Sequence, residues 1–394
     1  MIYLDNSATT YPKPPQVRQA VARALGELGA NPGRGGYPMS QRTAQAVYRC
    51  RGLAAEFFGA PGPECVIFQP SCTQALNLVL KGSLKQGDHV VVSDLEHNAV
   101  MRPLTALSAR GVTYTLAKTV PGDNDATLDA FRQAMGPRTK LVVCTQASNV
   151  FGFRLPVERI AALCHQYGAK LCVDAAQSAG LVPIHLQRDG IDYLCCAGHK
   201  GLYGPMGVGL LVLRDPADSL TPLIEGGTGT QSRSLAQPED SPERYESGTL
   251  NVPGIAGLEA GLLFVRRQGP QALCQKELAL LARLHRQLAG LPGVELYTEE
   301  PRAPYFLPVL SFNLRGMESE AVGEHLGQHR RAVRPALRPP GPPEAGHPAG
   351  HSAGVPLGLH PPGGDRRPGP AGGPPLPGES LRSSRKILFF LFFL

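Results

Sequence analysis

A lysine and an aspartate near the middle of this chain are of the types that hold a carbonyl cofactor. Lys200 follows a short apolar stretch and lies between Gly198 and Gly201. A lysine at the end of a buried strand, beside glycines that let other groups approach the backbone, suits a Schiff base with a cofactor aldehyde. Asp174 also closes an apolar stretch, and the ring nitrogen of pyridoxal phosphate (PLP) requires a buried carboxylate. Because a lone Gly-Lys pair is usually a solvated turn, the hypothesis depends on both residues.

The elements that must position these residues alternate between strand and helix. Apolar stretches predict strands at 65–68, 89–93, 112–116, 140–146, 170–173, 192–196 and 208–213, and helices are predicted between them at 73–80, 128–135 and 157–167. This alternation predicts a mostly parallel sheet covered on both faces, with ligands bound beyond the carboxyl ends of the strands. Polar residues that follow predicted strands should therefore converge, namely those at 71–73, 93–97, 148–149, 174–177 and 199–200.

Helices precede and follow this alternating region. Pro14 and Pro15 suit a helix start, and apolar residues then recur at near-helical spacing up to residue 28. Ser40 can cap a second helix that stops at Gly59. Residues 255–290 are helix-rich, and with a strand at 309–314 they indicate a smaller second domain.

Six short segments accompany these elements. They are residues 3–10, 96–98, 148–149, 174–177, 198–200 and 246–249. In this order they resemble the class V aminotransferase-fold enzymes, and specifically the cysteine desulfurases, over residues 1 to about 328. The resemblance implies an α/β protein with the PLP-dependent transferase fold type I. It implies an N-terminal segment at 1–15 that joins the small domain, a large PLP-binding domain at 16–254, and a smaller, here incomplete, α+β domain at 255–328.

The resemblance assigns several polar residues to one cofactor. Lys200 would carry PLP, and Asp174 would face its ring nitrogen. His97 would stack on the ring and handle protons, which makes it the second catalytic residue beside Lys200. Asn149 and Gln177 would hold the ring hydroxyl. Without the motifs, His97 would be interpreted as a surface or capping residue, and the two amides as loop caps.

The phosphate would lie at the start of a helix. Residues 71–73 open a helix after a predicted strand, so that backbone N–H groups and the Thr73 hydroxyl can face an anion. The alternative is that Thr73 only caps that helix. By resemblance Cys72, beside it, would also bind the cofactor, through its backbone; related enzymes commonly have alanine at this position. By resemblance His199 would also bind the phosphate, and Thr249 would reach the phosphate of a partner subunit, which implies a homodimer.

The substrate implied by the family is L-cysteine or selenocysteine, with Asn31 and Arg34 of a Gly-rich loop as contacts. Such an enzyme yields alanine and a persulfide, whose sulfur passes to an acceptor protein. The family's nucleophile lies in a Ser-Gly-x-His-Cys-Ala loop of the C-terminal domain, but the last cysteine here is Cys274, in a predicted helix. The chain is therefore expected to be impaired. The alternatives are a related lyase or aminotransferase that never needed the cysteine, and a non-catalytic scaffold that binds a sulfur partner.

The composition indicates the location of this protein and the classes of partner that it can have. Its nine cysteines have no paired or zinc-type spacing, which predicts reduced thiols, no metal site and a cytoplasmic location. No basic and apolar leader starts the sequence, and no membrane association is expected. The net charge of +7 is uneven: from Arg330 onward there are nine Lys/Arg against three Asp/Glu, which leaves about +1 for the first 329 residues. A nucleic-acid partner is therefore not supported.

Residues 329–394 form a Pro/Gly-rich tail unlike the rest of the chain. Between Pro335 and Ser380 there are 14 Pro and 11 Gly, a density that predicts disorder. The eight apolar residues at the end are too few to span a bilayer and are expected to promote aggregation. Advancing the reading frame by one base from His329 permits Ile-Ala-Val-Arg-Ser-Gly-Leu-His-Cys-Ala, which contains the missing loop. The tail is therefore interpreted as a shifted reading frame.

Overall fold

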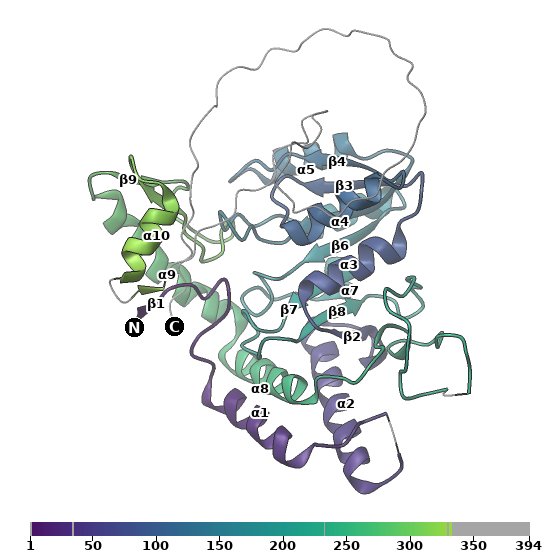
Figure 1. Cartoon of the computed structure of the whole chain (residues 1–394). Helices are drawn as coiled ribbons and strands as arrows, with labels where there is room; N and C mark the ends of the chain where they lie inside the picture. Colours follow the sequence, from purple (N-terminus) through teal and green to yellow (C-terminus); the bar gives the residue numbers. More distant parts are fainter. Residues whose placement is uncertain (1, 34, 232, 329–330, 333–394) are drawn as a thin grey trace, which may run out of the picture. The chain divides into compact units, whose positions relative to one another are not determined.

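A seven-stranded sheet is the largest sheet in the described part of the chain (Figure 1). The structure is a computed structural model that describes residues 2–33, 35–231, 233–328 and 331–332. The strand order is β2-β8-β7-β6-β5-β3-β4, and β8 is antiparallel to both of its neighbours. The strands are β2 (Val66–Gln69), β3 (His89–Ser93), β4 (Thr113–Ala117), β5 (Thr139–Thr145), β6 (Lys170–Asp174), β7 (Tyr193–Ala197) and β8 (Gly209–Leu213).

The strands are apolar runs because both faces of the sheet are covered. Every residue of β7 and β8 is buried, as is typical of strands between two layers of helices. β4 lies at the edge of the sheet, and there Thr113 and Thr115 are exposed. The predicted α/β fold with a mostly parallel sheet is confirmed, and each of the seven predicted strands is found within one residue of its expected bounds.

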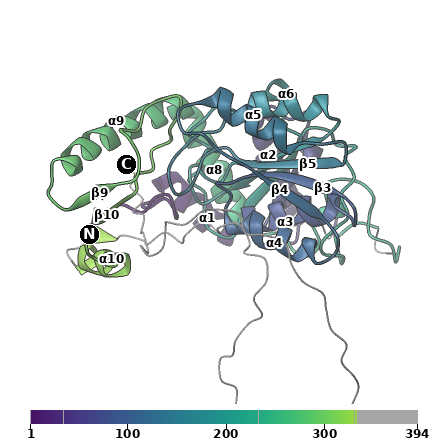
Figure 2. The same cartoon turned by 90° about the horizontal axis from the view of Figure 1, so that it is seen from above.

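Helices cover the two faces of the sheet (Figure 2). The helices on one face share a buried apolar cluster with the strands and are α2 (Pro38–Phe58), α5 (Asn124–Ala134), α6 (Val157–Gln166) and α8 (Val252–Gln268). Those on the other face are α3 (Cys72–Ser83) and α4 (Asn98–Ser108). α1 (Pro15–Glu27) packs on α8. The single-turn elements are η1 (Pro63–Cys65), α7 (Leu186–Asp189) and η2 (Glu243–Tyr245).

The segment after α8 contributes a second group of elements. They are α9 (Pro270–Ala289), β9 (Val294–Leu296), β10 (Phe312–Leu314) and α10 (Ser319–Gln328). β9 and β10 pair antiparallel, and β1 (Ile2–Tyr3) pairs parallel with β11 (Arg331–Ala332). The described residues all belong to one compact unit, so the predicted domain boundaries at 15, 254 and 328 stay predictions.

Two local expectations differ from the structure, and one helix was not expected. Ser40 lies inside α2 and does not cap it, because the helix begins at Pro38, whose fixed φ suits a first turn. The sequence pattern does not reveal α4, since Pro103 stands inside it. The expected strand at 309–314 is shorter and covers only β10. The tail expected to be disordered lies outside the described residues, apart from 331–332.

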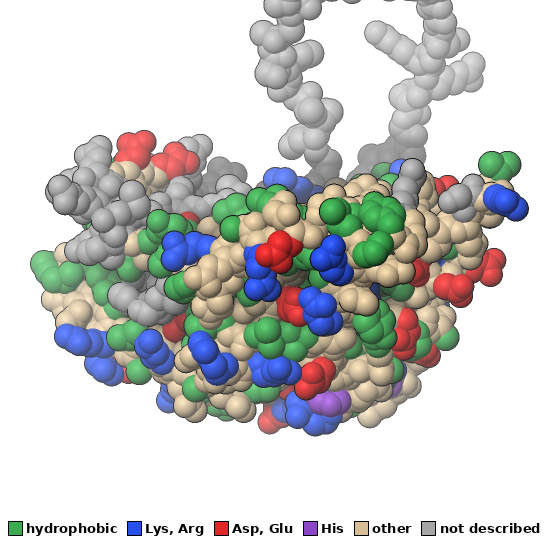
Figure 3. Space-filling model, turned by 90° about the horizontal axis from the view of Figure 1, so that it is seen from below, with side chains coloured by type: hydrophobic (Ala, Val, Ile, Leu, Met, Phe, Trp, Pro, Cys, Tyr) green, Lys and Arg blue, Asp and Glu red, His purple; other side chains and the backbone are tan. Residues whose placement is uncertain are grey.

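The surface carries charges of both signs. On the face drawn in Figure 3, Lys and Arg side chains are separated by acidic, hydrophobic and other groups. None of the helices in the described ranges is long and apolar enough to cross a membrane. The same ranges hold no group of three or more His, Cys, Asp or Glu that could bind a metal ion.

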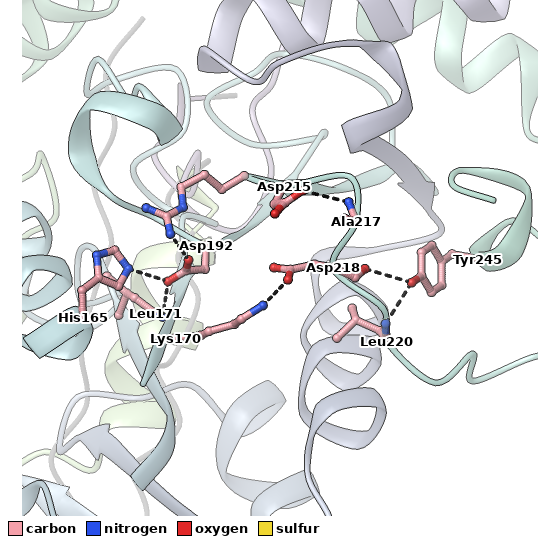
Figure 4. Close-up of polar contacts among 10 residues, drawn as sticks. His165, Lys170, Leu171, Asp192, Asp215, Ala217, Asp218, Leu220 and Tyr245 are labelled. Carbon is pink, nitrogen blue, oxygen red and sulfur yellow. Dashed lines mark hydrogen bonds and ion pairs between the residues drawn. The ribbon is translucent and has the colours of Figure 1, made fainter. Parts of the chain in front are cut away.

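A buried aspartate ties together the amino ends of the parallel strands (Figure 4). Asp192 precedes β7, and its Oδ2 accepts a hydrogen bond from the Leu171 N–H at 2.8 Å and contacts His165 Nε2 at 3.0 Å. Its Oδ1 lies 2.7 Å from Arg214 Nη2. Both oxygens of this carboxylate are therefore satisfied within the chain.

Candidate active site

The carboxyl ends of the strands border a cavity. Its lining includes Ser71, Cys72, Thr73, His97, Asn149, Asp174, Gln177, His199 and Lys200. These residues follow β2, β3, β5, β6 and β7, which all run in the same direction. The structure therefore brings together eight of the residues that the sequence assigns to the cofactor or to catalysis.

Asp174 ends β6 and is only 4% exposed. Its Oδ1 accepts hydrogen bonds from the Ala176 N–H at 2.9 Å and from the Cys72 thiol at 3.5 Å. Among the described residues no group donates to Oδ2. A carboxylate that is fixed through one oxygen and open at the other can accept the N–H of a cationic ring.

Lys200 lies in a loop that packs too closely for side chains at its glycines. A Cβ on Gly201 would lie 2.4 Å from the Ala179 carbonyl oxygen. Tyr203, which is 2% exposed, has a φ of 57°, in the left-handed region that residues with a Cβ rarely adopt. Close packing of this kind fixes the backbone from which Lys200 projects.

The N-terminal segment ties the same loop down. The His199 carbonyl oxygen accepts hydrogen bonds from the Thr10 N–H at 3.1 Å and from Lys13 Nζ at 2.6 Å. Gln177 Nε2 donates to the Ser7 carbonyl oxygen at 3.2 Å. The sequence did not indicate a role for Lys13, because its partner is 186 residues away. Burial lowers the pKa of Lys13 to about 8.

The start of α3 borders the cavity and suits an anion. Ser71 caps the helix, and its Oγ accepts the Gln74 N–H at 3.2 Å. The alternative that Thr73 is the cap is therefore wrong, and Thr73 is exposed where it lines the cavity. The first N–H groups of a helix lack partners within the helix and favour negative charge.

His199 is a second group that suits an anion. Its Nδ1 is buried, and no described residue makes a hydrogen bond to it. Burial, together with the charges of Lys200 and Lys13, lowers the pKa of His199 to about 4. An anion in the cavity would satisfy Nδ1 and offset the two neighbouring cations.

His97 both caps a helix and lines the cavity. Its Nδ1 accepts the Ala99 N–H at 3.0 Å at the start of α4. In the neutral ring the proton therefore lies on Nε2. The capping role that the sequence left as an alternative is present, and it does not remove His97 from the cavity.

Glu96 supports the site, although the sequence did not predict a role for it. Its Oε1 accepts the Thr145 N–H at 2.7 Å and a hydrogen bond from the Ser93 hydroxyl. It thereby joins the ends of β3 and β5 and fixes the turn before His97. Burial raises the pKa of Glu96 to about 8. The sequence feature that could have identified Glu96 is its place in the segment 96–98, beside His97, which the resemblance assigns to the site.

Asn31 and Thr249 lie outside the Lys200 cavity, and Asn31 Nδ2 donates to Thr249 Oγ1 at 3.4 Å. The loop that carries Thr249 is fixed by a buried ion pair in which Glu246 meets Arg51 through two contacts of 2.7 Å. Two roles stay predictions: that Thr249 binds the phosphate of a partner subunit, and that Asn31 contacts the substrate. Arg34 lies outside the described residues.

This fold, with a lysine and an aspartate at the ends of neighbouring strands, is that of the fold type I PLP enzymes. The sequence model described as aminotransferase class-V matches residues 2–338, and the chain belongs to that family. A probable cysteine desulfurase of Mycolicibacterium paratuberculosis is 36% identical over 338 residues, which is 83% of this chain and 48% of that protein. The chain spans about half the length of the first three curated relatives, at 48%, 54% and 52%.

Solved structures show the same likeness. An apo cysteine desulfurase from Thermococcus onnurineus matches with a TM-score of 0.77 and 30% identity, over 85% of this chain and 84% of that one. The structure of C-DES, in which glycine is covalently linked to the PLP cofactor, matches with a TM-score of 0.72 and 26% identity, over 85% and 89%. Enzymes of the class-V family depend on PLP. Asp174 Oδ2 and His199 Nδ1, neither of which has a hydrogen-bond partner in the part of the chain that the structure describes, fit its ring nitrogen and its phosphate.

Proposed function

We propose that this chain is built as a PLP-dependent cysteine desulfurase, which converts L-cysteine to L-alanine and leaves the sulfur as an enzyme persulfide. The observation that carries the proposal is the placement of Lys200 and Asp174 at the ends of the neighbouring strands β7 and β6, in one cavity. The names of the similar proteins support the same reaction. Selenocysteine is the second substrate that the proposal includes.

The residues of the cavity would each hold one part of the cofactor. When bound, PLP supplies an electron sink for the bonds of the substrate α-carbon. Lys200 Nζ would hold the cofactor aldehyde, and Asp174 Oδ2 would accept the ring N–H. His199 Nδ1 and Thr73, with the first N–H groups of α3, would bind the phosphate.

Other groups would orient the ring and move protons. His97 would stack on the ring and exchange a proton at Nε2. Gln177 already donates its Nε2 to the Ser7 carbonyl, so its Oε1 would accept the ring hydroxyl together with Asn149. These roles depend on side chains that the structure brings to one cavity.

The described cysteines support the expectation that sulfur transfer is impaired. Burial raises the pKa of eight of the nine thiols, to about 11 for Cys65 and about 12 for Cys274. A thiol with a raised pKa supplies little thiolate for attack on the substrate sulfur. The same observation favours, as the second candidate, a PLP lyase or aminotransferase that needs no cysteine. We propose that the missing loop is encoded by a shifted frame of residues 329–394, of which the structure describes only 331–332.

The proposal also covers the location, the oligomeric state and the sulfur acceptor of the enzyme. The chain would act as a cytoplasmic homodimer, with Thr249 directed to the cofactor site of the partner subunit, and would pass sulfur to an acceptor protein. The separation of Thr249 from the cavity of its own chain supports this arrangement. A non-catalytic scaffold is the remaining alternative, and it would not need PLP.

Cofactor binding and turnover can be tested separately. Purified protein mixed with PLP should gain a visible absorbance band, and borohydride should fix the cofactor on Lys200. Lys200→Ala should lose both signals, while the exposed control Lys85→Ala should keep them. A folded wild-type protein without the band would contradict the proposal. With PLP bound, alanine formed from L-cysteine supports the desulfurase, and amino transfer to a keto acid supports the second candidate. Restoring the frame by one base should restore persulfide formation.

A further inference from the structure

Cys72 is the cysteine, among those described, that lines the cofactor cavity. It is the first residue of α3 and is 8% exposed. Its Sγ lies 3.5 Å from Asp174 Oδ1, a suitable length for a hydrogen bond from sulfur, which is larger than oxygen. The thiol and the carboxylate come from different elements, α3 and β6.

The chemistry of the pair decides which group donates. Burial, and next the charge of Asp174, raise the pKa of the Cys72 thiol well above its usual range. The proton therefore stays on sulfur, and the carboxylate accepts it, because a thiolate beside Asp174 would place two negative charges together. This argues against Cys72 as the nucleophile that the chain lacks.

The hydrogen bond from Cys72 helps to fix the orientation of the Asp174 carboxylate, and therefore the position of its Oδ2. Oδ1 already accepts the Ala176 N–H at 2.9 Å, and the thiol is the second donor to the same oxygen. Two donors on one oxygen fix the rotation of the carboxylate. Oδ2 then remains for a ligand in the cavity.

We propose that Cys72 is a positioning residue: its thiol donates to Asp174 Oδ1 and thereby presents Oδ2, as a carboxylate oxygen, to the ring nitrogen of PLP. This inference rests on the proposed function, since it requires PLP in this cavity. It assigns a role to a side chain at which related enzymes commonly have alanine.

The test compares the PLP dissociation constants of four proteins, of which wild type is the first. Cys72→Ala removes the donor and should weaken PLP binding about threefold to tenfold. Cys72→Ser keeps a donor and should recover most of the affinity. Cys196→Ala is the matched control, since Cys196 is a fully buried thiol close enough to Asp174 for its pKa to be raised by it.

A double-mutant cycle shows whether Cys72 acts through Asp174. In an Asp174→Asn background, Cys72→Ala should cause no further loss of PLP affinity. An equal loss in both backgrounds, or a Cys72→Ala protein with wild-type PLP affinity, would overturn the inference while leaving the proposed function intact. Failure of wild-type protein to bind PLP would overturn both. Thermal midpoints of the PLP-free variants establish that each protein is folded.

Discussion

Asp174 and Asp192 lie at opposite ends of neighbouring strands, and both are buried. They differ in how many of their carboxylate oxygens have partners. Asp174, after β6, is 4% exposed, and Asp192, before β7, is 2% exposed. Asp192 has partners on both oxygens, including Arg214, whereas the described residues supply Asp174 with partners on Oδ1 only. Burial alone therefore does not mark a functional carboxylate. A buried carboxylate oxygen without a partner among the described residues is the better indicator of a functional carboxylate.

The histidines at the two edges differ in the same way. His165 Nε2 contacts Asp192 at 3.0 Å, whereas His199 Nδ1 is buried without a hydrogen bond from the described residues. At the amino edge the polar groups satisfy one another and stabilise the sheet. At the carboxyl edge they are left for a ligand, which is where perturbed pKa values are expected.

Asparagine at each aspartate should separate stability from cofactor binding. Asp192→Asn leaves Arg214 without its carboxylate, so we expect the free energy of unfolding of the PLP-free protein to fall by about 2–4 kcal/mol. Asp174→Asn should change that free energy by less than about 1 kcal/mol but weaken PLP binding at least about tenfold. Urea unfolding and PLP titration of the same samples measure both quantities. If Asp174→Asn proved the more destabilising, the contrast between the two edges would be lost.

Alanine at a glycine of each edge tests the packing around Lys200. In Gly201→Ala the new Cβ would lie 2.4 Å from the Ala179 carbonyl oxygen, so the loop must shift. We expect a loss of about 1–3 kcal/mol in the free energy of unfolding, with weaker PLP binding. Gly136, before β5, has open space around its Cβ position, and Gly136→Ala should stay within about 0.5 kcal/mol. Equal effects at the two glycines would count against close packing as the cause.

Glu96 should make the carboxyl edge sensitive to alkaline pH. Its pKa is raised from 4.5 to about 8, so the folded protein keeps a proton that the unfolded chain releases. The stability that this proton contributes is complete below pH 4.5 and is lost as the pH rises to about 8. Glu96→Gln should therefore reduce the fall in thermal midpoint between pH 5 and pH 8 without abolishing it, because burial raises the pKa of Glu277 to about 8 as well.

The control for this profile is Glu27→Gln, since the Glu27 side chain is 67% exposed. It should leave the pH dependence unchanged. A Glu96→Gln protein with the steepness of wild type would show that Glu96 is already ionised in the folded protein.

The smallest effect concerns inorganic phosphate. If His199 Nδ1 and the start of α3 form an anion site, about 10 mM phosphate should raise the thermal midpoint of the PLP-free protein by roughly 1–2 °C over chloride at the same ionic strength. The effect should be larger at pH 5 than at pH 8, because an anion favours the charged form of His199. His199→Gln should remove this pH dependence, and its persistence would place the anion elsewhere.

Local patterns account for what the sequence predicted correctly. β3 has its predicted bounds, because an uninterrupted apolar run between polar segments is sufficient to define a buried strand. Asp174 and Lys200 were found because each follows such a run, at the edge of the sheet where ligands bind. The order of strands along the chain thus predicted both the sheet and the edge that carries the site.

Contacts distant in the sequence could not be predicted in this way. Arg51 and Glu246 are 195 residues apart, and a buried ion pair leaves no periodic pattern at either residue. Asp192 likewise is predicted only as the first residue of an apolar strand, and the fold is needed to show that Arg214 pairs with its carboxylate. Helix ends depend on single residues, which is why Pro38 rather than Ser40 sets the start of α2.

The ties between the N-terminal segment and the His199 carbonyl set a time order for biosynthesis. Thr10 leaves the ribosome early, but its partner is made 189 residues later. Contacts of such high contact order form late, because a long loop of chain must close before they contribute any free energy. The nascent sheet can therefore assemble while the lysine loop is still unsecured. Cofactor capture would then report that the first residues of the chain have returned to the lysine loop.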